Sequence, residues 1–357
     1  MEFTNTQNNT ENTSQFRTRQ APSPTGFLHI GTARTVLFTK IIAIINSGIW
    51  YLRLEDTDRS RLQSDSVKVL LGAMDAIGLS ADEGICLAKN KVENKIKESV
   101  ENQENQELEE NPNNEIDEFY GIAQNGDYRP YIQSLRLPKY HKVAQDLIDK
   151  RLAYWSYLSP EEKQNLQELK QVTKAPIDYF QAILKHKYHH LMFQSVEDGL
   201  SDDFKPVLMY KIQRNSKVTC NDLLLGESKF SLLLEEDFAI LKSDGFPTYH
   251  LAHLVDDYEM DTTVVIRAQE WFPSFPKHQT MFMDYYGTVP DYIHLPFILG
   301  ENGNKKMSKR DGNVNLQDYI DKGYTAEAII NYLAFLGWNP GTEQELYLSP
   351  ADYSQSY

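Results

Sequence analysis

Cysteine is almost absent from this chain of 357 residues, which contains only Cys86 and Cys220. Two cysteines are too few for a disulfide framework or for a zinc site built from cysteines. A reducing compartment therefore fits best, and we expect the protein to be cytoplasmic. We expect it to be a monomer.

Long apolar runs are missing as well. A membrane-spanning helix needs about 18 consecutive apolar residues, but the best candidate, residues 41–45, is followed by Asn46 and Ser47. We therefore expect no contact with a membrane. Residues 1–16 are rich in Asn and Thr and lack the basic start and apolar stretch of a signal peptide. They are predicted to form a disordered tail.

Basic residues are in short supply, because 36 Lys and Arg stand against 51 Asp and Glu, for a net charge of −15. This balance argues against a nucleic-acid partner. In residues 89–118, however, four Lys stand against ten Asp and Glu, so this stretch alone carries −6 of the total. We interpret it as a solvated acidic low-complexity insertion without assigned chemistry. Charge weighs against an RNA partner without excluding one.

The first ordered segment has the pattern of an α/β protein. A turn-forming loop at residues 22–31 precedes a helical pattern at 31–45 and a strand-like run at 50–54. Strand, loop, helix and strand make the βαβ unit of doubly wound parallel sheets, which bind ligands beyond the carboxyl ends of their strands. The loop and the acidic turn at 55–58 both fall at that edge.

The middle of the chain is predicted to be a mixed α+β region. A helix is expected at 139–152, and Ser159-Pro160-Glu161-Glu162 is a capping box that begins another. Ser243-Asp244-Gly245 is typical of a tight turn. Strands are predicted at 207–212, 217–225 and 238–241. Residues 249–257 and 262–267 are predicted to return to the parallel sheet, and 326–337 to form an amphipathic helix.

Two features indicate phosphate binding. The glycine-bearing stretch 25–32 leads into a helix N-terminus, where backbone N–H groups favour an anion and His29 adds a donor. The stretch 305–310 places four cations in six residues, suited to stabilising a transferring phosphoryl group. Either feature alone is more often an ordinary surface loop; the pair is more specific.

Together these stretches resemble the two ATP motifs of class I aminoacyl-tRNA synthetases, His29-Ile30-Gly31-Thr32 for the first and Lys306-Met307-Ser308-Lys309-Arg310 for the second. Further stretches resemble the glutamyl-tRNA synthetase family. They are Ala21-Pro22-Ser23-Pro24-Thr25-Gly26, Arg53-Leu54-Glu55-Asp56-Thr57-Asp58-Arg59, Pro130-Tyr131-Ile132-Gln133-Ser134, Asp244-Gly245-Phe246-Pro247-Thr248-Tyr249, Val255-Asp256-Asp257 and residues 333–340. The resemblance runs with gaps from about residue 17 to residue 340.

The resemblance implies a glutamate site. Glutamate carries two carboxylates and one ammonium, so its site needs cationic groups and an anion. The implied carboxylate-binding residues are Arg19 and Arg267, with the Tyr249 hydroxyl, and which arginine meets which carboxylate stays open. Glu55, assisted by Ser23, is implied for the ammonium, and Trp271 for an aromatic wall.

The resemblance also implies an ATP site, with Mg²⁺ accompanying the nucleotide. His29 and Gly31 would approach the phosphates or ribose, and Glu270 the nucleoside. Lys309, with Lys306 and Ser308, would stabilise charge on the β- and γ-phosphates. Catalysis would depend on positioning and electrostatics, because the substrate carboxylate is already an anionic nucleophile.

The resemblance implies that tRNA receives the glutamate. An inserted domain would bind the acceptor stem, with Gln133, Ser134 and Arg136 as contacts. RNA is recognised largely through shape, phosphates and 2′-hydroxyls, so a long basic run is not required. The predicted domains are a tail (1–16), the first half of a Rossmann-like catalytic domain (17–86), the inserted domain (87–246), the second half of the catalytic domain (247–304), and the second ATP motif with the start of a helical stem-contact region (305–357).

The sequence departs from the family pattern in several places. Residues 155–157 lack the cysteines that help many glutamyl enzymes to bind zinc, so we expect no zinc or other resident metal. Thr32 replaces a histidine of the first motif, and His253 stands where a smaller polar residue is expected. No anticodon-binding domain is recognised, so the chain would be a fragment or a natural short form, and charging of glutamine tRNA stays open.

Two other functions are alternatives to glutamate--tRNA ligation for this chain. A paralogue that attaches glutamate to queuosine in the tRNA for aspartate is also short, but it is expected to keep the zinc cysteines and to have a weaker second motif. A non-catalytic tRNA-binding module would be expected to lose the ATP residues. The presence of His29, Lys306 and Lys309 favours the glutamate-tRNA ligase.

Overall fold

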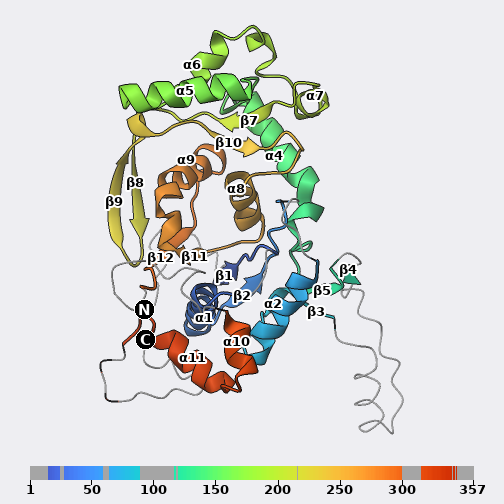
Figure 1. Ribbon diagram of the computed structural model, residues 1–357, viewed down its shortest axis with the longest axis vertical. Coiled ribbons are helices and arrows are strands. Elements are labelled where there is room, and N and C mark those ends of the chain that lie inside the picture. Colours follow the sequence, from blue (N-terminus) through green and yellow to red (C-terminus); the bar gives the residue numbers. More distant parts are fainter. Residues whose placement is uncertain are drawn as a thin grey trace. The chain divides into compact units, whose positions relative to one another are not determined.

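The computed structural model describes residues 15–24, 28–58, 64–88, 116–117, 120–214, 216–299, 315–339, 341 and 343 (Figure 1). Contacts gather the chain into two compact units, the first made of Met1–Ile132 and Pro296–Tyr357 and the second of Gln133–Leu295. These units do not coincide with the domain boundaries drawn from the sequence, which stay predictions. Most of the predicted tail, nearly all of the acidic insertion and the second ATP motif lie outside the described residues.

The first unit begins with the predicted βαβ arrangement, made of β1 (Arg17–Gln20), α1 (Ile30–Ile45) and β2 (Ile49–Leu52). Strands β1 and β2 are parallel, with Arg19 opposite Tyr51. The face of α1 that carries Ala33, Val36 and Leu37 is completely buried, as the helical spacing of these residues requires.

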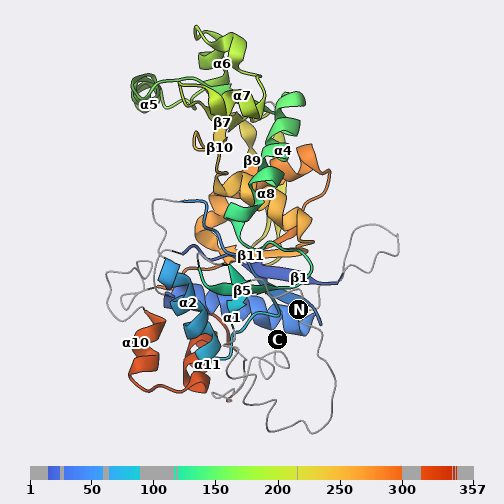
Figure 2. The same ribbon diagram turned by 90° about the vertical axis from the view of Figure 1, so that its right-hand side faces the viewer.

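The rest of the first unit extends this sheet and covers it with helices. The further elements are α2 (Ser64–Ala76), β3 (Glu83–Leu87), β4 (Ile116–Asp117), β5 (Ile122–Asn125), α10 (Leu316–Asp321) and α11 (Ala326–Phe335). Strand β3 is parallel to β2, whereas β5 and β4 follow in antiparallel pairing. Helix α11 packs on α1, and α10 packs on α2 (Figure 2). The helix predicted at 326–337 is confirmed.

The second unit contains another group of parallel strands. Its elements are β8 (Lys217–Asp222), β9 (Gly226–Ser231), α8 (Tyr249–Glu259), β11 (Val264–Ala268), a 3₁₀ helix η5 (Gln269–Ser274), α9 (Phe275–Tyr285) and β12 (Asp291–Leu295). Strand β12 is parallel to both β11 and β8, and β9 closes the edge in antiparallel pairing. The predicted α/β fold, rich in parallel strands, is confirmed.

The prediction that residues 249–257 return to the sheet is wrong, because they form most of helix α8. Every residue from Leu251 to Asp257 is buried. A helix that is buried on all sides shows no alternation of polar and apolar faces, so its sequence resembles that of a buried strand.

The remainder of the second unit is the α+β part. Its elements are η2 (Gln133–Arg136), α4 (Leu137–Asp149), β6 (Ala153–Ser156), α5 (Pro160–Thr173), α6 (Tyr179–Leu184), η3 (His189–Leu191), α7 (Val196–Ser201), β7 (Val207–Tyr210), η4 (Leu232–Leu234) and β10 (Phe238–Leu241). Strands β10, β7 and β6 form an antiparallel sheet. The capping box of Ser159 and Glu162 begins α5 as predicted, and Gly245 occupies a turn at a φ of 84°.

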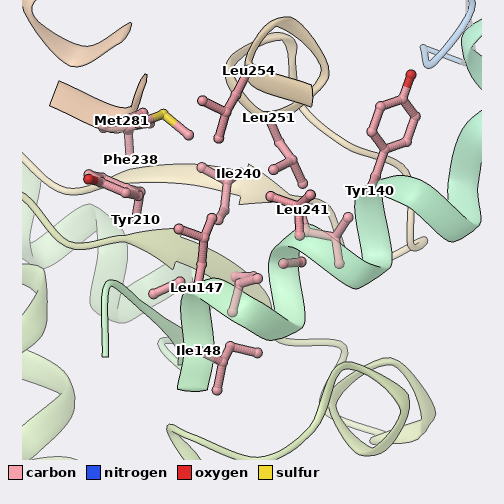
Figure 3. Packing of buried hydrophobic residues seen from close by; sticks show 14 of the residues in the cluster. Tyr140, Leu147, Ile148, Tyr210, Phe238, Ile240, Leu241, Leu251, Leu254 and Met281 are labelled. Carbon is pink, nitrogen blue, oxygen red and sulfur yellow. The ribbon is translucent and has the colours of Figure 1, made fainter. Parts of the chain in front are cut away.

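A large apolar cluster joins these parts within the second unit (Figure 3). Leu147 of α4, Ile240 of β10, Leu251 of α8 and Met281 of α9 all belong to this cluster, and each of these side chains is completely buried. Burying a side chain of this size contributes roughly 1.5–3 kcal/mol. Helices α8 and α9, which carry Tyr249 and His278 of the polar cluster described below, are therefore held by a well-packed core. Among the described residues, no helix is both long and apolar enough to cross a membrane.

Candidate functional site

Arg267 is the centre of a buried polar cluster in the second unit. It lies on β11 and is only 5% exposed. Its Nε–H donates to Nε2 of His294 (2.9 Å), and its NH1 donates to Nδ1 of His278 (3.0 Å) and to the Tyr249 hydroxyl (3.2 Å). NH2 makes only a long contact of 3.4 Å with the carbonyl oxygen of Trp271. Three of the residues predicted for glutamate binding, Arg267, Tyr249 and Trp271, are thus brought together.

The two histidines beside Arg267 are neutral acceptors. A guanidinium only donates hydrogen bonds, so the ring nitrogen that meets it must carry no proton. Burial, helped by the positive charge of Arg267, lowers the pKa of His294 although its bond to Asp222 acts in the opposite direction. Burial also lowers the pKa of His278 well below its ordinary value.

Among the residues that the structure describes, no carboxylate directly contacts the Arg267 guanidinium. Its hydrogen-bond partners are two imidazoles, a hydroxyl and a carbonyl, and its guanidinium also lies 4.9 Å from the ring centre of Tyr292. Removing an ion from water costs several kcal/mol unless an opposite charge compensates. The cluster is therefore chemically suited to an anionic ligand.

Tyr249 and Trp271 form the aromatic side of this cluster. Their ring centres are 4.3 Å apart, and Trp271 is 37% exposed. Glu270, predicted to meet the nucleoside, precedes Trp271 on η5 and is exposed. The exposed indole next to a buried cation provides an apolar surface beside the charged group.

His253 is explained by the fold. Its ring stacks on Tyr249 with an interplanar angle of 5°. Its Nδ1 pairs with Asp257 Oδ2 (2.5 Å), and its Nε2 pairs with the Tyr292 hydroxyl (2.8 Å). The histidine therefore fills the space under Tyr249 with a ring whose two nitrogens are both hydrogen-bonded. A smaller polar residue would leave part of that space empty.

The other residues predicted for glutamate binding lie in the first unit. Arg19 is buried on β1. Beyond the paired strands, the amide of Glu55 donates to the carbonyl oxygen of Pro22 (3.0 Å), so the segment that carries Ser23 runs beside Glu55. Ser23 is exposed and Glu55 half-buried, and the Glu55 carboxylate lies 3.6 Å from the Arg53 guanidinium. These groups sit at the carboxyl ends of β1 and β2, as the βαβ pattern predicted.

His29 caps the N-terminus of α1. Its Nδ1 accepts a hydrogen bond from the amide of Gly31 (3.0 Å), so the neutral ring carries its proton on Nε2. The backbone of His29 also forms an antiparallel bridge with Asn315. Lys306, Ser308 and Lys309 lie outside the described residues.

Two of the predicted tRNA contacts, on the 3₁₀ helix η2 that precedes α4, make buried contacts in the structure. Gln133 and Arg136 are each 1% exposed and donate to opposite oxygens of Asp256, at 2.8 and 2.7 Å. Tyr140 donates to the same carboxylate. Buried side chains that are bonded in this way are not presented to an RNA in this conformation. Ser134 is half-buried and stays a proposed contact.

The described residues contain no group of three or more His, Cys, Asp or Glu arranged to hold a metal ion. Trp155 and Ser156, where zinc cysteines occur in many related enzymes, are buried on β6. The absence of zinc stays a prediction.

Sequence reasoning missed His278, His294 and Asp222. His294 lies in the apolar strand β12, and His278 points inward from α9 among apolar residues. A polar residue within an apolar run was the available signal. The pairing of these histidines with Arg267 depends on how separate elements pack, which local pattern does not reveal.

Comparison with known proteins places this fold in a class. A family model described as tRNA synthetases class I (E and Q), catalytic domain, matches residues 15–353. The structure resembles a crystal structure of a glutamate tRNA ligase from Elizabethkingia meningosepticum in complex with its amino acid, with a TM-score of 0.75 and 28% identity, over 96% of this chain and 65% of the other. The chain therefore belongs to the glutamate and glutamine family of class I tRNA synthetase catalytic domains.

Curated relatives agree with this family. The chain is 36% identical over 332 residues to glutamate--tRNA ligase from Borreliella afzelii, covering 93% of this chain and 59% of the relative. It is 35% identical over 333 residues to the enzyme of the same name from Clostridioides difficile, covering 93% and 60%. The chain thus spans about three fifths of the length of these relatives.

Proposed function

We propose that this chain is the catalytic part of an enzyme that joins glutamate to tRNA at the expense of ATP. Membership of the family supports this reaction class. The single observation that carries the choice of an acidic substrate is the buried Arg267, whose direct hydrogen-bond partners within the described part of the chain are all neutral. A buried cation in this setting is stabilised by an anionic ligand.

Arg267 and Tyr249 would bind one carboxylate of glutamate. NH2 is the part of the guanidinium with the weakest protein contact, and the Tyr249 oxygen, which accepts from NH1, can donate its own proton to the ligand. Two donors converging on one carboxylate give both affinity and orientation. Trp271 would cover the aliphatic part of the substrate. The roles of Arg19, Ser23 and Glu55 toward glutamate rest on the sequence resemblance.

The N-terminus of α1 would bind ATP. A helix N-terminus favours phosphate, and the proton on His29 Nε2 can donate to a phosphate oxygen. Lys309 precedes Asn315 by six residues, a length of chain that spans at most about 20 Å. Asn315 is bridged to His29, and the sequence resemblance assigns Lys309 to the phosphates of the same nucleotide. Mg²⁺ would accompany the triphosphate, where one or two protein carboxylates usually suffice.

The reaction would proceed in two transfers. A carboxylate oxygen of glutamate attacks the α-phosphorus of ATP, the bond from that phosphorus to the bridging oxygen of the β-phosphate breaks, and pyrophosphate leaves. The terminal 2′-hydroxyl oxygen of tRNA then attacks the carbonyl carbon of the resulting glutamyl-adenylate. The bond from that carbon to the phosphate oxygen breaks, AMP leaves, and the hydroxyl proton is released. Fixed positive charge from Lys306 and Lys309, with Ser308, would stabilise the departing pyrophosphate.

The partners would be glutamate, ATP and the acceptor stem of a tRNA, in the cytoplasm, with the protein as a monomer. Gln133 and Arg136 would support the acceptor-stem region through Asp256 and would not touch RNA.

Charging of purified tRNA with radiolabelled glutamate tests this function. We expect ATP-dependent, acid-precipitable label on a tRNA for glutamate and none with labelled aspartate. Label on the tRNA for aspartate carrying queuosine, but not on the tRNA for glutamate, would point to the paralogue. ATP-independent binding of tRNA without any charging would point to a non-catalytic module.

A further inference from the structure

Two histidines contact adjacent parts of the Arg267 guanidinium. His294, from β12, accepts the Nε–H, and His278, from α9, accepts an N–H of NH1. Each nitrogen is within 3.0 Å of its donor, and both imidazoles are 1% exposed or less. These contacts fix the plane of the guanidinium from two different elements.

Each histidine is held in one tautomer by a second residue. Asp222 accepts a hydrogen bond from His294 Nδ1 (2.6 Å), so the proton of that ring stays on the side away from Arg267. His278 uses its Nε2 to donate to Nδ1 of His250 (2.9 Å), which leaves its Nδ1 for Arg267. The chain of bonds runs from Asp222 through His294, Arg267 and His278 to His250.

The Asp222 carboxylate is itself fixed. Its other oxygen accepts from the amides of Leu224 and Leu225, at 2.9 and 2.7 Å. Burial by itself would raise the pKa of Asp222, but the bonds from His294 and these two amides lower it. The carboxylate is thus an ionised acceptor that orients His294. The His294 ring lies between this carboxylate and the Arg267 guanidinium.

We propose that His294 and His278 are positioning residues for substrate recognition, which hold Arg267 so that NH2 remains available for a carboxylate of the amino acid substrate. This inference rests on the proposed function. A carboxylate placed directly on Arg267 would hold it equally well but would neutralise the charge that the substrate requires. Neutral imidazoles fix the direction of the guanidinium and leave its charge for the ligand.

Pairs of variants that keep or remove the acceptor test this role. The amide oxygen of glutamine can occupy the place of an imidazole Nε2, and that of asparagine the place of Nδ1. His294→Gln and His278→Asn therefore keep an acceptor for Arg267, whereas His294→Leu and His278→Leu remove it. His141→Leu is the control, because His141 is a half-buried histidine that bonds the carbonyl oxygen of Gly245 and not Arg267.

Steady-state glutamate-dependent pyrophosphate exchange, with tRNA present, gives the readout in the full chain. We expect each leucine variant to raise the KM for glutamate about tenfold with a smaller change in kcat, since orientation of a binding group is lost. His294→Gln and His278→Asn should recover most of this loss. His141→Leu should leave the KM for glutamate within about twofold.

The outcomes separate this inference from the proposed function. If Arg267→Ala raises the KM for glutamate but both leucine variants leave it unchanged, the positioning role is wrong while the glutamate site stands. If Arg267→Ala leaves the KM unchanged, the glutamate site itself is wrong. A third outcome is that the variants with and without an acceptor lose kcat and melting temperature to the same extent while the KM for glutamate stays constant. This outcome would show that the histidines only stabilise the fold.

Discussion

The backbone of Asn315 pairs with that of His29 in an antiparallel bridge, and the next amide, Leu316 N–H, donates to the carbonyl oxygen of Leu28 at 2.9 Å. Two stretches more than 280 residues apart in the sequence therefore meet at the N-terminus of α1. Arg34 of the same helix donates to the carbonyl oxygens of Leu336 (2.8 Å) and Pro296. Helix α1 thus binds backbone on both sides of the segment 300–314.

Lys309→Ala should reduce kcat of pyrophosphate exchange about 100-fold, because a fixed charge aimed at the leaving group acts mainly in the transition state. The KM for glutamate should change little, since the lysine is assigned to the phosphates. Steady-state kinetics at varied glutamate and varied ATP measure both. A large rise in the KM for glutamate with an intact kcat would contradict the assignment.

Arg267→Lys keeps a positive charge but loses the planar fork that His294 and His278 hold. We expect the KM for glutamate to rise at least tenfold, because lysine cannot reproduce the set of directed N–H groups. Competition by glutamine should become relatively stronger, since the carboxylate-specific contact is weakened. An unchanged preference for glutamate over glutamine in this variant would argue that another cation selects the substrate.

Stability should fall as the pH decreases from about 6.5 to about 4. Burial, with the nearby charges of Lys277 and Arg267, lowers the pKa of His250 to about 4. The unfolded chain therefore takes up this proton at a higher pH than the folded chain does, so acid favours unfolding across that interval. His250→Asn keeps an acceptor for His278 but does not titrate. Urea denaturation should show a weaker pH dependence in the variant, and identical slopes would rule out His250 as a contributor.

The buried ion pair of Arg136 and Asp256 should matter for folding. Arg136→Met leaves Asp256 without its cation in a fully buried position, which costs roughly 3–5 kcal/mol of unfolding free energy. The control is Lys139→Met, which removes a 44% exposed partner of Glu259 and should cost less than about 1 kcal/mol. If Arg136→Met weakens tRNA binding without loss of stability, the original prediction of a direct RNA contact is right.

Local pattern predicted much of the fold. The helical spacing of Ala33, Val36 and Leu37 predicted α1, and the capping box at Ser159 predicted the start of α5. Both signals depend only on residues that are close together in the sequence. The sequence of α8 misled because burial on all sides removes the polar face on which helix recognition depends.

The candidate site was only partly visible in the sequence. The motifs identified Arg267, Tyr249 and Trp271, which the structure brings together. They could not identify the acceptors of Arg267, because His278 and His294 come from different elements and meet the arginine only after packing. For the same reason, the sequence does not reveal that Gln133 and Arg136, which it predicts as tRNA contacts, bond Asp256 more than a hundred residues later.

The central claim is that the chain activates glutamate with ATP, and pyrophosphate exchange tests it most directly. The full chain is incubated with ATP, labelled pyrophosphate and each amino acid in turn, with and without tRNA. We predict that label is incorporated into ATP only when glutamate is present, and that tRNA promotes this incorporation. At low glutamate, Arg267→Ala should abolish it. Exchange that depends on a different amino acid, and not on glutamate, would contradict it.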